Sequence, residues 1–136
     1  MRRHPIRIGI MIAAVTTSGL AQAATLADHA SLICGLVDMN SCVVGEVCQR
    51  ENAAALNLPT VVKIDIAAKT IVGQRIDGPG QTTPIGTIQH NDQGLVLQGV
   101  DGQRSWNAVV DDEGRLSIAA IGPDGAFLIF GACATP

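Results

Sequence analysis

Four cysteines carry the clearest chemical signal in the chain: Cys34, Cys42, Cys48 and Cys133. An even number predicts two disulfides in an oxidising compartment, with three possible connectivities. Zinc and thiol-redox sites are built on close pairs such as C-x-x-C, and the sequence contains none. Cys42 and Cys48 enclose a short loop that a disulfide closes easily, and this pairing leaves Cys34 to bridge Cys133.

The loop between Cys42 and Cys48 is the candidate binding surface. It carries Val43, Val44 and Glu46, and a disulfide-tethered loop is pre-organised, which lowers the entropy cost of binding. Two interpretations stay open. The valines contact a partner, or they tuck under the end of the fold.

A run of acidic residues at positions 111–113 has the oxygen ligands that hard cations prefer. A calcium loop, however, spaces its ligands alternately over about twelve residues and ends on a late Glu. Because Gly114 follows three consecutive acids, the run is interpreted as a solvated hairpin turn, and no metal ligand is assigned.

His29 and His90 are the candidate general bases downstream of the N-terminal segment, and Ser105 is a candidate nucleophile. A general base needs a nucleophile and an orienting partner, and Ser105 lacks the G-x-S-x-G elbow. Trp106 alternates with apolar neighbours, which favours core packing over ligand stacking. We therefore expect a protein that is not an enzyme and has no cofactor.

The N-terminus has the parts of a secretory signal peptide. Arg2, Arg3 and Arg7 form a basic region, residues 8–20 are an apolar stretch, and Ala21-Gln22-Ala23 is a small–x–small cleavage site. The apolar stretch is shorter than the roughly 20 residues of a membrane-spanning helix. We expect cleavage after the first 23 residues, no membrane insertion afterwards, and a location in the periplasm or outside the cell.

Cleavage leaves residues 24–136 as a single domain. It removes three of the nine basic residues and none of the twelve acidic ones, so the net charge becomes −6. We expect a chain this acidic to have no nucleic-acid partner, because phosphate contacts need clustered positive charge.

Turn signals made of Asp, Asn, Gly and Pro recur at short intervals from Leu58 onward. Several runs between them alternate between apolar and polar residues, as half-buried strands do. The fold class predicted is all-β: a disulfide-stapled, eight-stranded antiparallel meander that is barrel-like. The predicted strands are residues 30–37, 60–66, 71–76, 85–90, 95–100, 104–110, 115–121 and 126–132.

Three expectations concern the interior of this fold. Alternation places Val62 and Ile64, and likewise Trp106 and Ala108, on inward faces. The run Phe127–Phe130 is apolar on both faces and is expected to be covered on both sides. The many medium-sized aliphatic side chains indicate a filled core.

Two families share parts of this pattern. A cysteine in the first strand, two cysteines around a short loop and the terminal Phe130-Gly131-Ala132-Cys133 resemble small exported proteins of proteobacteria that have no assigned function. A weaker resemblance is to envelope inhibitors of C-type lysozyme, which are small β-barrels with a signal peptide and a bridge from the first strand to near the C-terminus. Those inhibitors carry a Trp-x-Lys-Gly-type segment. Ser105-Trp106-Asn107-Ala108 lacks the lysine, so no inhibitory residue is transferred.

The predicted export, the two predicted disulfides and the lack of a catalytic acid–base arrangement together predict a non-enzymatic envelope protein. The function expected is a protein-binding module whose partner is another envelope or extracellular protein. The alternatives are a lysozyme-inhibitor-like protein and a barrel that holds a small apolar ligand.

Overall fold

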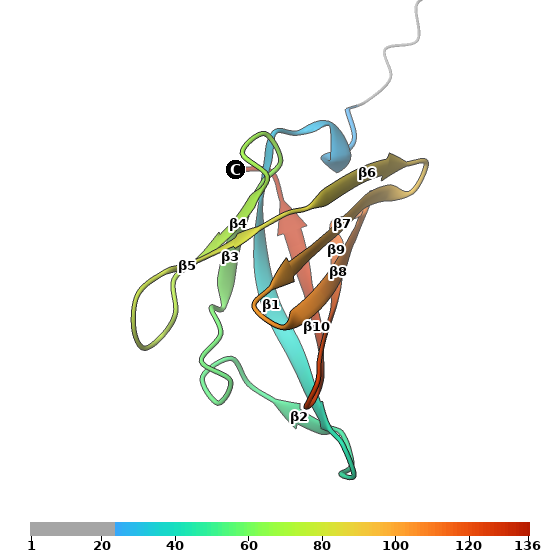
Figure 1. The fold of residues 1–136 in the computed structure, drawn as a ribbon. Coiled ribbons are helices and arrows are strands. Elements are labelled where there is room, and N and C mark those ends of the chain that lie inside the picture. Colours follow the sequence, from blue (N-terminus) through green and yellow to red (C-terminus); the bar gives the residue numbers. More distant parts are fainter. Residues whose placement is uncertain (1–23) are drawn as a thin grey trace, which may run out of the picture.

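The computed structural model describes residues 24–136, and the predicted signal peptide lies outside them. They form one curled antiparallel sheet of ten strands and a short 3-10 helix, so the predicted all-β, barrel-like class is confirmed (Figure 1). The elements are η1 (Leu26–Asp28), β1 (Ser31–Val43), β2 (Gln49–Glu51), β3 (Val61–Asp65), β4 (Thr70–Gly73), β5 (Gln81–Pro84), β6 (Thr87–Asn91), β7 (Gly94–Asp101), β8 (Arg104–Asp111), β9 (Arg115–Gly122) and β10 (Gly125–Ala134).

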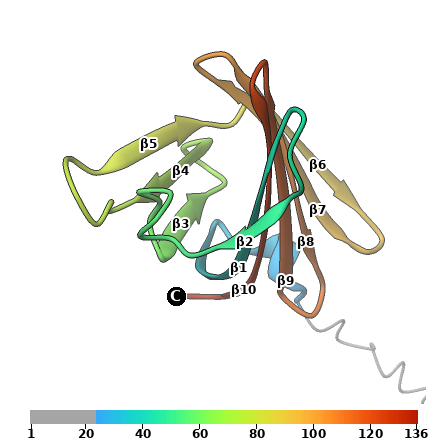
Figure 2. The same ribbon diagram turned by 90° about the horizontal axis from the view of Figure 1, so that it is seen from below.

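The strands follow the order β5-β4-β3-β1-β10-β9-β8-β7-β6, and β2 pairs with β1 beside this path. β1 lies next to β10, so the first and last strands of the meander are neighbours. Figure 2 shows the resulting curl, in which β3, β4 and β5 form one wall and β6 to β9 form the other. The sheet is therefore a half-barrel.

The two ends of the sheet meet at the junction between β5 and β6. The Ile85 N–H donates to the carbonyl of Lys69 at 2.9 Å, on the β4 side, and the Gly86 N–H donates to the carbonyl of Gln98 at 2.8 Å, on the β7 side. One extended segment thus pairs first with β4 and then with β7. The sheet closes into a barrel only at this junction, because β5 pairs with β4 alone and β6 pairs with β7 alone.

The number of strands differs from the prediction for two local reasons. β5 and β6 are two halves of one extended segment, which stands where the fourth of the eight strands was predicted. β2 is a short strand that pairs with β1. Neither β2 (Gln-Arg-Glu) nor β5 (Gln-Thr-Thr-Pro) has an apolar alternation, so the sequence did not indicate them. Their backbone pairing with β1 and β4 makes them strands.

β1 is longer than predicted and changes partners along its length. Residues 31–35 pair with β3, and residues 39–41 pair with β2, while β10 runs along the other edge. A β-bulge lies between these two segments, because Leu36 is opposite Gly131 and Asp38 is opposite Phe130. Val37 is the extra residue and points into solvent.

The inward positions predicted from alternation are buried. Val62, Ile64, Trp106 and Ala108 belong to the main core cluster, which packs against η1. The expectation that Phe127–Phe130 is covered on both faces is wrong. Leu128 and Phe130 face outward and are 40% and 44% exposed, because the strand has one face on the interior and nothing among the described residues covers the other.

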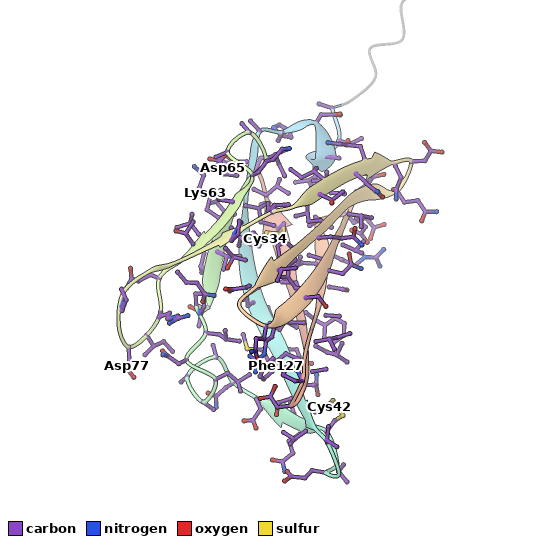
Figure 3. The ribbon with its side chains drawn as sticks, in the orientation of Figure 1. Cys34, Cys42, Lys63, Asp65, Asp77 and Phe127 are labelled. Carbon is purple, nitrogen blue, oxygen red and sulfur yellow. A yellow bond between two sulfur atoms is a disulfide. The ribbon has the colours of Figure 1, made fainter. Side chains whose placement is uncertain are left out.

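The disulfides join Cys34 to Cys133 and Cys42 to Cys48, the pairing expected from the sequence. Cys34 and Cys133 are directly opposite each other on β1 and β10, with Cα atoms 4.0 Å apart. Cys42 lies near the tip of the β1–β2 hairpin (Figure 3). Two disulfides indicate an oxidising, non-cytoplasmic compartment.

The two bridges differ in the length of chain that they close. Replacing Cys34 and Cys133 with alanine opens a separation of 99 residues, against 6 for Cys42 and Cys48. The chain-entropy relation gives losses of about 4–5 and about 2 kcal/mol in the free energy of unfolding. Urea unfolding of the two double variants measures the difference. Equal losses would contradict the loop-length explanation.

Candidate functional site

The inside of the half-barrel is filled at one end and hollow at the other. The filled end holds the core cluster beneath η1, where Leu26 lies beside Gly114. The hollow end lies near the β7–β8 and β9–β10 turns and contains a cavity of about 900 Å³. The cavity is partly open to solvent, and it is the candidate functional site.

Apolar side chains from several elements form most of the cavity wall. One side consists of Leu36 on β1, Ile118 on β9 and Ile129 on β10. The facing side consists of Ile71 on β4 and Leu58 in the loop after β2. These residues come from every part of the domain, so the cavity exists only when the sheet has curled.

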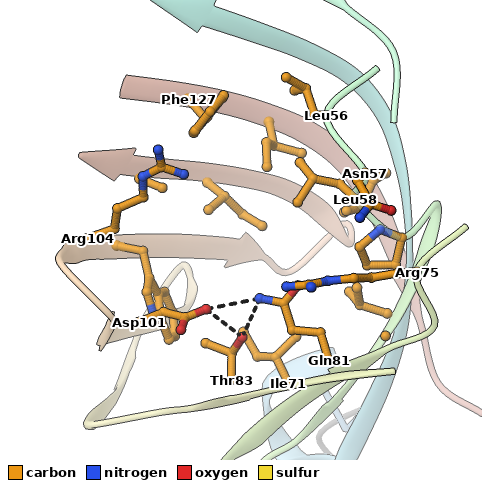
Figure 4. Close-up of a pocket in the computed structure, with 18 of the residues that line it drawn as sticks. Leu56, Asn57, Leu58, Ile71, Arg75, Gln81, Thr83, Asp101, Arg104 and Phe127 are labelled. Carbon is orange, nitrogen blue, oxygen red and sulfur yellow. Dashed lines mark hydrogen bonds between the residues drawn. The ribbon is translucent and has the colours of Figure 1, made fainter. Parts of the chain in front are cut away.

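Polar side chains gather on the side of the cavity where the two sheet walls come together. The Gln81 side-chain amide donates from Nε2 to Oδ2 of Asp101 at 2.9 Å, and the Thr83 hydroxyl lies 3.4 Å from the same oxygen. Nε of Arg75 donates to Oε1 of Gln81 at 3.2 Å. Figure 4 shows this row of side chains, which connects the β4–β5 hairpin to the end of β7.

The expectation of a filled core is wrong at this end of the barrel. An eight-position barrel is just wide enough for side chains to fill or for one small ligand to occupy. The chain has one Trp, two Phe and no Tyr, and the cavity wall includes small residues such as Ala120 and Thr83. Medium-sized aliphatic side chains reach the middle of the interior only where both walls are close.

Trp106 lies at the boundary between the filled and hollow ends. It belongs to the core cluster and is 8% exposed, yet it also lines the cavity. The indole packs over Gly99, its partner across β7 and β8. Its Nε1 is buried and has no hydrogen-bond partner among the described residues. Trp106 thus packs in the core and also forms part of the cavity wall.

The predicted binding loop lies apart from the cavity. Val43, Val44 and Glu46 are at the tip of the β1–β2 hairpin and do not line the main cavity. Val44 is 80% exposed and Val47 is 84% exposed. The valines do not tuck under the end of the barrel, because the loop extends beyond β2 into solvent (Figure 1).

The acidic run at positions 111–113 forms the β8–β9 turn. Oδ1 of Asp111 accepts the backbone N–H groups of Glu113 at 3.0 Å and Arg115 at 2.8 Å, and the Arg115 side chain donates to Oδ2 at 2.6 Å. The backbone N–H of Arg115 and then its side chain lower the pKa of Asp111 below the ordinary value. Asp111 is thus committed to organising the turn.

His90 and Ser105, which a catalytic site would need to bring together, are at opposite ends of the sheet. His90 is opposite Leu95, which is opposite Val110 at the far end of β8 from Ser105. Val110 and Ser105 are five residues apart along β8, which is about 17 Å. His29 follows η1 on the filled side.

Trp106 was weighed for ligand stacking, but sequence reasoning missed the polar residues that line the cavity. Arg75 lies in a hairpin of Gly, Pro and polar residues, and Gln81 and Thr83 lie on a strand without alternation. The available signal for a cavity was indirect: the chain has few large side chains with which to fill a barrel of eight strands.

Comparison of the chain with protein-family models, curated proteins and solved structures finds no match. Both resemblances therefore stay expectations. Within residues 24–136, no helix is long and apolar enough to cross a membrane.

The contact between Trp106 and Gly99 can be tested with one methyl group. A Cβ at Gly99 would lie 2.6 Å from Cζ2 of Trp106 and 2.8 Å from the carbonyl oxygen of Pro84, so Gly99→Ala must displace the indole or β5. We expect a loss of about 1–3 kcal/mol in the free energy of unfolding, measured in urea. Gly35→Ala is the control, because a Cβ there meets nothing within 4 Å. Equal stability of the two variants would show that the indole does not hold this position.

Proposed function

We propose that this protein binds one small, largely apolar molecule in the cavity of the half-barrel. The observation that carries the proposal is the cavity of about 900 Å³ with its apolar wall and its polar residues on one side. Ligand pockets typically enclose about 300–1,000 Å³ and combine an apolar lining with a few polar groups. A ligand in this partly open space would remove the apolar wall from water, which is favourable.

The proposal makes the protein a binding protein of the envelope or the extracellular space rather than an enzyme. The disulfides support a location outside the cytoplasm, and the predicted signal peptide supports export. The separation of His90 from Ser105 along the sheet supports binding without catalysis. Of the functions expected from the sequence, the ligand-holding barrel is thus preferred over the protein-binding module.

A neutral apolar dye tests the proposal. N-phenyl-1-naphthylamine should bind with a stoichiometry of one and accept energy from Trp106, the single tryptophan of the chain. Ala120→Phe projects a ring into the cavity from β9 and should weaken binding by about tenfold or more. The measurement is a fluorescence titration of the disulfide-bonded protein.

The control is Ala119→Phe, because Ala119 directly precedes Ala120 on β9 and lies on the outer face beside Leu128. It should leave the affinity unchanged. Absence of saturable binding, or equal binding by both variants, would overturn the proposal.

A second candidate function is the protein-binding module, and the exposed valines of the Cys42–Cys48 loop favour it. Apolar side chains held in solvent by a disulfide are available for contact with a partner at low entropy cost. An envelope or extracellular protein is the partner class that export implies.

Introducing negative charge on the loop surface tests this candidate. The double substitution Val44→Asp and Val47→Asp should abolish retention of any specific envelope protein on the immobilised chain, since a desolvated carboxylate opposes an apolar contact. Val100→Asp is the control, because Val100 is exposed on β7. Proteins retained equally by wild type and both variants would exclude the loop as their contact.

A further inference from the structure

Four charged side chains line the cavity, and two of them neutralise each other. Nη2 of Arg104 lies 3.4 Å from Oδ2 of Asp124. The Arg104 guanidinium also lies over the ring of Phe127, at 4.7 Å from its centroid. The charge of Arg104 is therefore balanced within the protein, and Figure 4 shows its side chain on the opposite side of the cavity from Arg75.

Arg75 is the cation of the cavity wall that lacks such a partner. Among residues 24–136, no carboxylate lies within 4 Å of its guanidinium, and its side chain makes one hydrogen bond, from Nε to Oε1 of Gln81. The side chain is half-buried, so water hydrates it less than it hydrates an exposed arginine. The two terminal nitrogens keep their donors for another acceptor.

Gln81 fixes which donors of Arg75 stay free. Its Oε1 accepts from Arg75, while its Nε2 donates to Asp101, so its amide group has a defined orientation between the two charged residues. With Nε engaged, Nη1 and Nη2 form the fork that matches a carboxylate in bidentate geometry.

Asp101 does not take the place of that carboxylate. It is exposed at the end of β7, and its Oδ2 already accepts from Gln81 and lies near the Thr83 hydroxyl. It reaches Arg75 only through the Gln81 amide. Because Asp101 is exposed and does not contact Arg75 directly, solvent screens the attraction between their charges.

We propose that the cavity prefers amphiphiles with a single carboxylate, such as fatty acids, whose head group Arg75 holds while the chain packs against Leu36, Ile118 and Ile129. This inference rests on the proposed ligand-binding function and specifies its ligand class. The apolar wall accounts for the chain, and the free fork of Arg75 accounts for the charge of the head group.

The test compares dodecanoate with methyl dodecanoate, which keeps the chain and removes the charge. Each competes with N-phenyl-1-naphthylamine for the disulfide-bonded protein, at concentrations below micelle formation. Dodecanoate should bind about tenfold or more tightly than the ester, because a charge-assisted bidentate contact has that magnitude. Decanoate, two methylenes shorter, should bind on the order of tenfold more weakly than dodecanoate.

Arg75→Gln should reduce the ratio of the dodecanoate and ester affinities to about one. The matched control is Arg50→Gln, because Arg50 is exposed and pairs with Asp38 away from the cavity; it should keep the wild-type ratio. A second measurement needs no variant. The preference of the wild type should disappear when the pH falls from 7 to about 4, since the carboxylate of the ligand becomes protonated.

The outcomes separate the two proposals. Equal binding of acid and ester by the wild type, or a preference that survives Arg75→Gln, overturns the carboxylate inference and leaves the apolar cavity as the binding site. Tighter binding of dodecyltrimethylammonium than of dodecanoate also overturns it. Failure of the dye and of every dodecyl ligand to bind overturns the proposed function itself.

Discussion

β1 pairs with three other strands, and the rest of the architecture follows from how it divides its edges among them. One edge runs along β10 from Ile33 to Val43, with Cys34 bonded to Cys133. The other edge belongs first to β3 and then to β2. At the bulge where the partner changes, the Leu36 N–H donates to the carbonyl of Thr60. Residues 52–60, between β2 and β3, therefore leave this edge and cross over the inner face of the sheet, where Leu56 and Leu58 pack.

That crossing segment gives the cavity its second wall. Leu56, Leu58 and Pro59 belong to it, and all three line the cavity. The bulge at Val37 lies where β1 changes its partner from β3 to β2, and the segment packs Leu56 and Leu58 over this part of the interior. The candidate site is thus a consequence of backbone pairing rather than of a special motif.

Some of this could be predicted from the sequence because the signals were local. Alternation placed Trp106 and Val62 inside, and the short spacing of Cys42 and Cys48 indicated which cysteines pair. The cavity was out of reach because empty volume depends on the distance between two walls, which no window of sequence contains. β5 was missed since its pairing with β4 overrides a composition of polar residues and proline. The expectation for Phe127–Phe130 was wrong for a related reason: an apolar side chain can stay exposed, as Leu128 and Phe130 do.

The pairing of β1 with β10 also sets the timing of maturation. In a chain that enters the oxidising compartment N-terminus first, as it is synthesised at about 5–20 residues per second, Cys133 follows Cys34 by about 5–20 s. During that interval the first strand lacks its longest partner, and Cys42 and Cys48 are the thiols within reach of Cys34. Oxidation between Cys42 and Cys48 in that interval gives a native bridge, whereas oxidation of Cys34 with either of them gives a wrong one. Cys34 therefore reaches its native bridge only if its oxidation follows the arrival of the last strand, or if an isomerase exchanges a wrong bridge for the one to Cys133.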